Sequence, residues 1–228
     1  PEKLRAQILH LVRKELGEGY DIDRDFTPRY NPWDQRLCLV PDADLFRAIH
    51  AGKARVATGD IERITEDGVQ MQDGELIKAE VLVTATGLNL QLFGGVDFFR
   101  NEAPIDFSRH YTYQGMMMSD IPNLVWTFGY INASWTLRAA LNSRFVCDVL
   151  RLMEATGPTR VGPVQSGDDR EMPFKPWIQD FTPGYMQRGL SQFPVQGDRP
   201  PWQNTQNFLE DRKRLKNGPL DDGVLQFQ

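Results

Sequence analysis

Three short segments carry residue types that could hold a cofactor. The first is an apolar run at 81–83, predicted to be a buried strand of a parallel sheet, which leads into Ala85, Thr86 and Gly87. Small residues at the carboxyl end of such a strand let the backbone come close to a flat or phosphorylated cofactor. The alternative is a plain strand and turn in which Gly87 supplies a positive φ, and spacing alone favours it.

The second segment, 128–136, joins a predicted buried strand at 124–128 to a long helix. The start of a helix has unpaired backbone N–H groups and a partial positive charge, which could stabilise the negative charge on a reduced flavin ring. Asn132 or Ser134 could cap this helix. An ordinary strand, loop and helix with a core tryptophan explains the segment equally well. The residues that could contact the cofactor are Asn132, Ala133, Ser134 and Trp135.

The third segment places Gln35 and Arg36 where a loop enters a predicted strand at 37–40. Arginine keeps its charge and offers a planar fork of donors, so Arg36 could hold a nicotinamide nucleotide and stabilise an anionic peroxide. Composition alone favours the alternative, which is a surface ion pair. The acidic residues near enough in sequence to form that pair are Asp34, Asp42 and Asp44.

The composition argues against several other classes of protein. A net charge of −5 speaks against binding nucleic acid or a strongly anionic membrane surface. No apolar run reaches the ~18–20 residues of a membrane span, and we expect a cytoplasmic protein without a signal peptide. Cys38, Cys147 and the histidines are scattered without the spacing of metal ligands, so no metal site is predicted.

The elements that would position these segments belong to an α/β fold. Apolar residues at helical spacing predict an amphipathic helix over 4–16 that ends at Gly17. The pairs Asp67-Gly68 and Asp73-Gly74 predict the turns of a β-meander over 61–77. Further predicted elements are helices at 45–49 (capped by Asp42 or Asp44), at 137–152 and from 202 or 204 to 216, extended segments at 55–57 and 109–118, an exposed loop at 157–173 and an irregular wrap at 174–202.

Five strings carry a family resemblance, and they are YNPWDQRLCLVPDADLF (30–46), TATGLNLQLFGG (84–95), GYINASWTL (129–137), FTPGY (181–185) and the tail at 202–218. They resemble the ethionamide-activating monooxygenases of the Baeyer–Villiger flavoprotein family. The resemblance extends over most of the chain. A meander followed by Ala-Thr-Gly would by itself indicate only the wider class of flavoproteins with two dinucleotide-binding domains.

The resemblance implies part of a flavoprotein with two Rossmann-like dinucleotide-binding domains, a β-meander and an irregular C-terminal wrap. Residues 1–88 would be the later part of an NADP-binding domain, and 89–228 the C-terminal part of an FAD-binding domain with a C-terminal extension. Family members also have two glycine-rich phosphate loops, whereas the one Gly-x-Gly here, at 17–19, follows a helix. We therefore expect a fragment that is colourless and inactive by itself.

The resemblance also implies an activity that uses FAD and NADPH. NADPH reduces the flavin, O2 adds at flavin C4a, and the resulting peroxide transfers one oxygen atom to a small apolar ketone or to the sulfur of a thioether or thioamide. Arg36 matches the family arginine that steadies both the peroxyflavin and the nicotinamide. Gln35 stands where many relatives have lysine, which lowers the local charge. No nucleic acid is expected as a partner, and the protein could form a homo-oligomer.

Two other functions stay open at this point. A flavin-dependent NAD(P)H reductase without oxygenation would use the same cofactors. Such a reductase would require a redox-active cysteine pair, whereas Cys38 and Cys147 are far apart in sequence. The other is a non-catalytic domain that never binds FAD. The favoured function requires Arg36 and the start of the helix at Trp135 to converge on one isoalloxazine ring.

Overall fold

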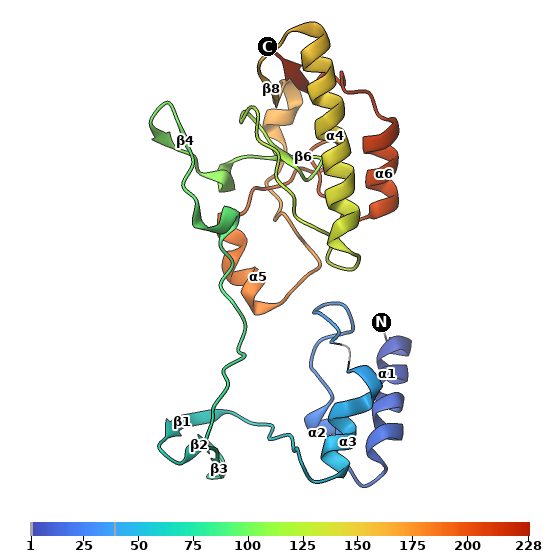
Figure 1. Ribbon diagram of the computed structural model, residues 1–228, viewed down its shortest axis with the longest axis vertical. Helices are drawn as coiled ribbons and strands as arrows, with labels where there is room; N and C mark the ends of the chain where they lie inside the picture. Colours follow the sequence, from blue (N-terminus) through green and yellow to red (C-terminus); the bar gives the residue numbers. More distant parts are fainter. Residues whose placement is uncertain (1, 39) are drawn as a thin grey trace. The chain divides into compact units, whose positions relative to one another are not determined.

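The computed structural model describes residues 2–38 and 40–228 (Figure 1). The chain forms two compact units, Pro1–Leu88 and Asn89–Gln228, which we call the N-terminal and C-terminal units. Helices occur together with small antiparallel sheets, so the mixed α/β class is confirmed. The sheets within the described ranges contain only antiparallel strand pairs, and a Rossmann-like sheet is therefore not seen in them.

Three helices form the first half of the N-terminal unit, and they are α1 (Glu2–Leu16), α2 (Ile22–Asp25) and α3 (Asp44–His50). Helix α1 contacts both of the others, and His50 Nε2 lies 2.5 Å from the carbonyl oxygen of Glu15. Gly17 follows α1 with a φ of +83°, as the sequence predicts. The predicted aspartate cap of α3 is wrong, because Ala43 occupies the N-cap and Asp44 is already the first helical residue.

Asp25 connects these helices to the segment that leads into the meander. Its carboxylate accepts hydrogen bonds from Arg24 Nε (2.7 Å), the Tyr20 hydroxyl (2.9 Å) and the Thr58 hydroxyl (2.8 Å). These bonds, that from Arg24 above all, hold the pKa of Asp25 well below its ordinary value. The charged carboxylate therefore fixes Thr58 to the end of α2.

The predicted β-meander is confirmed as three antiparallel strands, β1 (Ile61–Thr65), β2 (Gly68–Met71) and β3 (Leu76–Lys78). Val69 of the middle strand pairs with Ile64 on one side and Ile77 on the other, and it is buried. Gly68 opens the middle strand with a φ of +147°, and a Cβ atom there would lie 2.0 Å from the carbonyl oxygen of Ile77. Only glycine therefore fits at this position without moving β3.

Replacing Gly68 by alanine is expected to separate β2 from β3, because the new methyl group would overlap the backbone of β3. Backbone conformations of this kind cost about 1–3 kcal/mol in a residue other than glycine, before the overlap is counted. Amide hydrogen exchange at Val69 and Ile77 measures the effect, and we expect their protection to be lost. Gly74→Ala is the control, since Gly74 also has a positive φ but open space around it. Unchanged protection in Gly68→Ala would contradict the prediction.

Four segments that the sequence predicts as strands are not strands, and they are 37–40 (of which Leu39 lies outside the described residues), 55–57, 81–83 and 124–128. The run at 81–83 is also exposed rather than buried on both faces, with Val81 at 78% and Val83 at 80%. A strand is stable only when neighbouring strands pair with it, and no described strand pairs with this run. The apolar residues indicate that the run at 81–83 favours a strand, but they do not show whether a neighbouring strand is there to pair with it.

Helix α4 (Trp135–Thr156) is the long helix predicted for the C-terminal unit, and it ends at Gly157 with a φ of +91°. It lies beside α6 (Phe208–Asn217), as Figure 1 shows. Helix α6 begins later than predicted. Its N-cap is Asn207, whose side-chain oxygen accepts hydrogen bonds from backbone N–H groups of the first turn.

Short strand pairs complete the C-terminal unit, and they are β4 (Phe99–Arg100) with β5 (Ala103–Pro104), β6 (Thr112–Tyr113) with β7 (Met117–Met118), and β8 (Val161–Pro163) with β9 (Leu225–Phe227). The predicted exposed loop at 157–173 is wrong where β8 forms, because that strand is buried against β9. The stretch 174–202 is irregular apart from α5 (Gly184–Gly189) and one short turn. The described 3-10 turns are Pro41–Ala43, Leu92–Gly95, Phe107–Arg109, Gly167–Glu171 and Leu190–Gln192.

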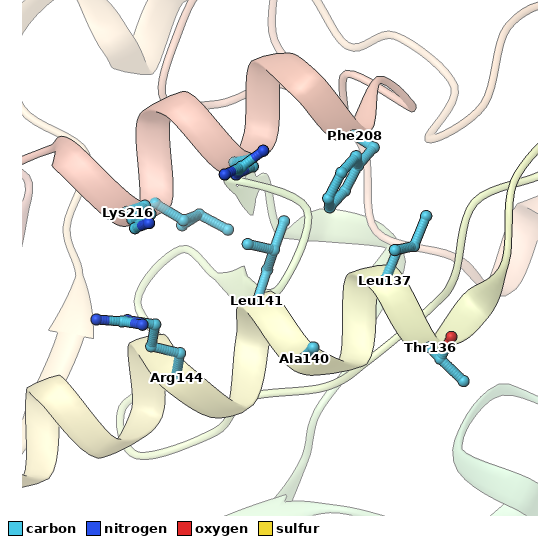
Figure 2. A pocket seen from close by; sticks show the side chains of 9 residues that line it. Thr136, Leu137, Ala140, Leu141, Arg144, Phe208 and Lys216 are labelled. Atoms are coloured by element: carbon cyan, nitrogen blue, oxygen red, sulfur yellow. The ribbon is translucent and has the colours of Figure 1, made fainter.

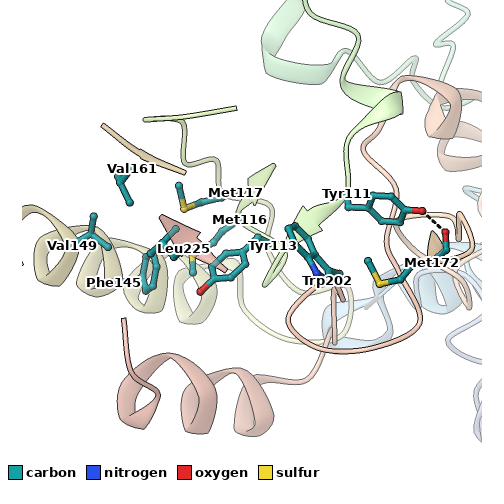
Figure 3. Packing of buried hydrophobic residues seen from close by; sticks show 10 residues of the cluster. All are labelled: Tyr111, Tyr113, Met116, Met117, Phe145, Val149, Val161, Met172, Trp202 and Leu225. Carbon is teal, nitrogen blue, oxygen red and sulfur yellow. Dashed lines mark hydrogen bonds between the residues drawn. The ribbon is translucent and has the colours of Figure 1, made fainter. Parts of the chain in front are cut away.

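Two clusters of buried side chains form the core of the C-terminal unit. Figure 3 shows the first, the Trp202 cluster, in which the Tyr111 hydroxyl donates to the carbonyl oxygen of Met172. Its buried members are Tyr111, Tyr113, Met116, Met117, Phe145, Val149, Val161, Met172, Trp202 and Leu225. The second, the Trp177 cluster, contains Phe107, Met118, Ile121, Trp126, Trp177, Ile178, Phe181, Met186 and Phe193. The irregular stretch 174–202 combines exposed residues with buried members of both clusters, so this wrap also contributes to the core.

Candidate functional site

The turn into α4 is built around Gly129. A Cβ atom on Gly129 would lie 2.1 Å from Cγ of Trp135, so the indole ring covers the glycine directly. The ring centroids of Phe128 and Trp135 are 4.9 Å apart, and Phe128 in turn packs edge-on against Trp177 of the second cluster. Trp135 is nevertheless 49% exposed, so the alternative in which it is a core residue is wrong. One part of its ring packs on the protein, and the rest is open to a ligand.

The helix start itself is exposed. Ser134, not Asn132, is the N-cap, and its hydroxyl oxygen accepts a 3.4 Å hydrogen bond from the backbone N–H of Thr136. The preceding residue Ile131 is anchored, because its N–H donates to Gln206 Oε1 at 2.9 Å. Within the described ranges, the side chain of Asn132 and the backbone N–H of Ala133 have no hydrogen-bond partner. The turn therefore presents free donors at the positive end of a helix of 22 residues.

A buried ionic network lies behind this turn. Arg138 is 3% exposed, and its Nη1 lies 2.5 Å from Asp211 Oδ2 on α6. The Tyr130 hydroxyl donates to the same oxygen at 2.7 Å, and the Thr205 hydroxyl donates to Oδ1 at 2.6 Å. Arg138 Nη2 also donates to the carbonyl oxygen of Gln114. Burial, together with the hydrogen bond to Asp211, raises the pKa of Tyr130, so its hydroxyl stays a donor.

This network was not predicted from the sequence. Arg138 lies on the same buried face of α4 as Phe145 and Val149, and a charged residue on such a face is the signal that a buried partner exists. The partner, Asp211, is 73 residues away in sequence. The network joins α4, α6 and the turn at 129–134, and it thereby fixes the backbone that carries the exposed donors.

Gly129→Ala is expected to displace the Trp135 indole, because the methyl group and the ring cannot occupy the same space. We expect a red shift and a loss of intensity in tryptophan fluorescence, with little change in helix content measured by circular dichroism. Gly184→Ala in the same unit is the control, since its added Cβ would meet only the flexible end of the Arg188 side chain. A variant whose Trp135 keeps its environment would contradict the packing described above.

The N-terminal unit contains the other two predicted site segments, at 35–36 and 85–87, and most of their residues are exposed. Arg36 is exposed, and it forms no ion pair with Asp42 or Asp44 in the described structure; Asp44 pairs with Arg47 at 3.3 Å instead. Gln35 is partly buried and forms a backbone bridge to Pro32.

Ala85, Thr86 and Gly87 are exposed and irregular. Gly87 has a φ of +105°, so the conformational role foreseen for it is confirmed. The run at 81–83 that leads into them is not a strand, so these small side chains do not lie at the predicted sheet edge. Asn132 to Trp135 share one turn, whereas the convergence of Arg36 with the start of α4 stays a prediction.

The residues that the structure describes contain no group of three or more histidine, cysteine, aspartate or glutamate side chains that could hold a metal ion. None of the helices there is long and apolar enough to cross a bilayer. Both cysteines are free and exposed.

The chain is similar along its whole length to several curated proteins. It is 47% identical over 228 residues to the FAD-containing monooxygenase EthA of Mycobacterium tuberculosis and 44% identical over 228 residues to EthA of Mycolicibacterium smegmatis. It is 42% identical over 227 residues to the "Probable FAD-binding monooxygenase AlmA" of Acinetobacter baylyi. Each alignment covers 100% of this chain and 45–46% of the relative.

No protein-family model matches the chain, and no solved structure matches it significantly. The chain spans about half the length of the curated relatives that it matches. The resemblance predicted from the sequence is nevertheless confirmed at the level of their names: from end to end, this chain is similar to FAD-containing monooxygenases.

Proposed function

We propose that this chain is part of a monooxygenase that uses FAD and NADPH. It would insert one oxygen atom of O2 into a small apolar ketone, or add it to the sulfur of a thioether or thioamide. The observation that carries the proposal is the identity of 42–47% over the whole chain to proteins named FAD-containing or FAD-binding monooxygenases. The reaction balances as substrate, O2, NADPH and a proton giving oxygenated substrate, water and NADP+.

The start of α4 fits a flavin. Its free donors and positive helix end suit a ring that becomes negatively charged on reduction, and Trp135 offers a partly exposed aromatic face beside them. Bound FAD would supply the transfer of electrons from NADPH to O2. The residues of this chain would bind and orient it through Asn132, Ala133, Ser134 and Trp135.

Arg36 would serve the nicotinamide nucleotide. An exposed guanidinium for which the described residues provide no ion pair is available to bind a phosphate or carboxamide and to stabilise negative charge that develops during oxygen transfer. Gln35 beside it offers an amide but no charge. Ala85, Thr86 and Gly87 would allow a close approach of the backbone to the cofactor.

The cofactor assignments of the two units follow from the same proposal. The N-terminal unit would be the later part of an NADP-binding domain, and the C-terminal unit the corresponding part of an FAD-binding domain. The exposed apolar run at 81–83 supports Rossmann-like pairing in a longer protein, because an apolar run that lacks neighbours here would gain them there. The protein would act in the cytoplasm, and it could form a homo-oligomer.

The test is made on a full-length protein that contains this chain. With a thioether or a ketone present, we expect NADPH consumption to match the formation of sulfoxide or ester, measured by absorbance and mass spectrometry. NADPH oxidation that never yields an oxygenated product would refute the monooxygenase and favour a flavin-dependent reductase. A protein that is stable but never binds FAD would refute both and favour a non-catalytic domain.

The 228-residue chain alone gives a second check. We expect it to be colourless and to leave NADPH unconsumed, because it has no glycine-rich phosphate loop to hold the pyrophosphate of either cofactor. Absorbance near the flavin bands, after incubation with FAD and gel filtration, measures this. A yellow chain that oxidises NADPH would show that the phosphate loops are dispensable.

A further inference from the structure

We propose that the groove between α4 and α6 binds an anionic amphiphile, namely a carboxylate with an unbranched apolar tail such as a medium-chain fatty-acid anion. The groove is open to solvent and has a volume of about 670 Å³. Cavities of roughly 300–1,000 Å³ are the size that takes small organic ligands. The proposal is independent of the proposed oxygenation, since nothing in it requires FAD.

The walls of the groove are apolar. Leu137 and Leu141 line it from α4, and Phe208 and Leu215 line it from α6. Leu215 packs against the Trp202 cluster, and the ring of Phe208 lies 6.2 Å from that of Tyr130. The Arg138–Asp211 pair holds the two helices together behind the groove. An apolar tail placed here would therefore leave water for a preformed surface.

Three cations line the same cavity, and they are Arg144, Arg212 and Lys216. Arg212 and Lys216 are four residues apart on α6, where like charges repel. Neither forms an ion pair in the described structure, and no aspartate or glutamate lines the cavity. Arg144 has only a 4.0 Å exposed contact with Asp148, which contributes little. Although the chain has a net charge of −5, this groove has a local excess of positive charge, which favours binding of an anion.

The charges are not spread evenly along the groove. Figure 2 shows Arg144 and Lys216 toward one end, with Phe208, Leu137 and Thr136 toward the other. A ligand that satisfies both ends needs an anionic head and an apolar body. A carboxylate suits the head, because two guanidinium groups and an ammonium offer it paired, charge-assisted hydrogen bonds. A nucleic acid is disfavoured, since it would leave the apolar end uncovered.

Isothermal titration of dodecanoate into the 228-residue chain, below the concentration at which the ligand self-associates, tests the proposal. We expect saturable one-to-one binding. The double variant Arg212→Ala, Lys216→Ala should bind at least about ten-fold more weakly, because the head group loses two charged donors. Lys213→Ala is the matched control, since it removes a cation from the same helix that does not line this cavity. Its affinity should stay within about two-fold of the unmodified chain at physiological salt.

A second variant tests the tail. Ala140 is exposed and lines the cavity, so Ala140→Trp should fill the groove without disturbing the core. We expect it to abolish dodecanoate binding while circular dichroism and the melting temperature stay unchanged. Acetate (a head without a tail) and dodecyltrimethylammonium (the same tail with a cationic head) should both fail to bind the unmodified chain.

Three results would overturn the proposal. One is dodecanoate binding that is equal in the unmodified chain, in the double variant and in Ala140→Trp. Another is binding to vesicles of anionic phospholipid with no binding of monomeric dodecanoate, which would make the groove a membrane contact. The third is a concentration-dependent dimer, seen by analytical ultracentrifugation, whose formation closes the groove to dodecanoate.

Discussion

Replacing Asp211 by alanine is expected to destabilise the C-terminal unit by about 3–5 kcal/mol, since it leaves a buried charge without its partner. Arg138 would keep its charge at 3% exposure, and the hydroxyl groups of Tyr130 and Thr205 would lose their acceptor. Urea unfolding followed by tryptophan fluorescence measures the loss. Four of the five tryptophans lie in the C-terminal unit, so this signal reports mainly on it.

Two further variants show whether the cause is the unpaired charge. Asp148→Ala removes an exposed carboxylate that pairs with Arg151 on the surface of α4, and it should cost less than about 1 kcal/mol. The double variant Arg138→Met, Asp211→Leu removes both charges and should be more stable than Asp211→Ala alone. A loss in Asp211→Ala no larger than that in Asp148→Ala would show that the network contributes nothing to stability.

Replacing Arg36 by alanine in a full-length protein that contains this chain is expected to abolish oxygenation while leaving some flavin reduction. Removing one donor that stabilises developing negative charge typically costs ~10²–10³-fold in rate, and we expect a loss of product formation in that range. Product is measured by mass spectrometry, and flavin reduction by stopped-flow absorbance under anaerobic conditions. If product formation is lost while flavin reduction persists, the variant is folded and Arg36 acts in oxygen transfer.

Arg29→Ala is a suitable control, because Arg29 is another exposed arginine of the N-terminal unit and is not part of the proposed site. We expect it to oxygenate at the unmodified rate. Arg36→Lys keeps the charge but not the planar fork, so it should recover only part of the activity. Oxygenation that survives Arg36→Ala would remove the role proposed for this residue, while leaving the assignment of the α4 turn to the flavin untouched.

Local signals predicted the local elements well. The helical spacing before Gly17, the two Asp-Gly turns of the meander and the long helix ending at Gly157 all occur as predicted, because each depends on residues close in sequence. Strands depend on distant partners. The apolar runs at 81–83 and 124–128 have strand-like composition, yet neither forms a strand.

In the candidate site, too, local features were predicted and features that depend on distant residues were not. Ser134 as a cap and Gly87 at a positive φ follow from residue type and were predicted. The partner of Arg138 and the packing of Trp135 over Gly129 depend on the fold, and neither could be inferred from spacing. The exposure of Trp135 contradicted its apolar character. A large exposed aromatic ring is more informative about a ligand than a buried one.

The bare stretch Val81, Leu82 and Val83 has a practical consequence for anyone handling the purified protein. With exposures of 78%, 47% and 80%, two β-prone valines and the leucine between them face solvent together. Exposed apolar segments of this kind can pair with the same segment of other copies and form cross-β aggregates. Charged residues next to such a segment oppose this pairing. Glu80 is the adjacent charge. Solubility at high concentration should therefore depend on this carboxylate, and Glu80→Gln should bring on turbidity and fibril formation.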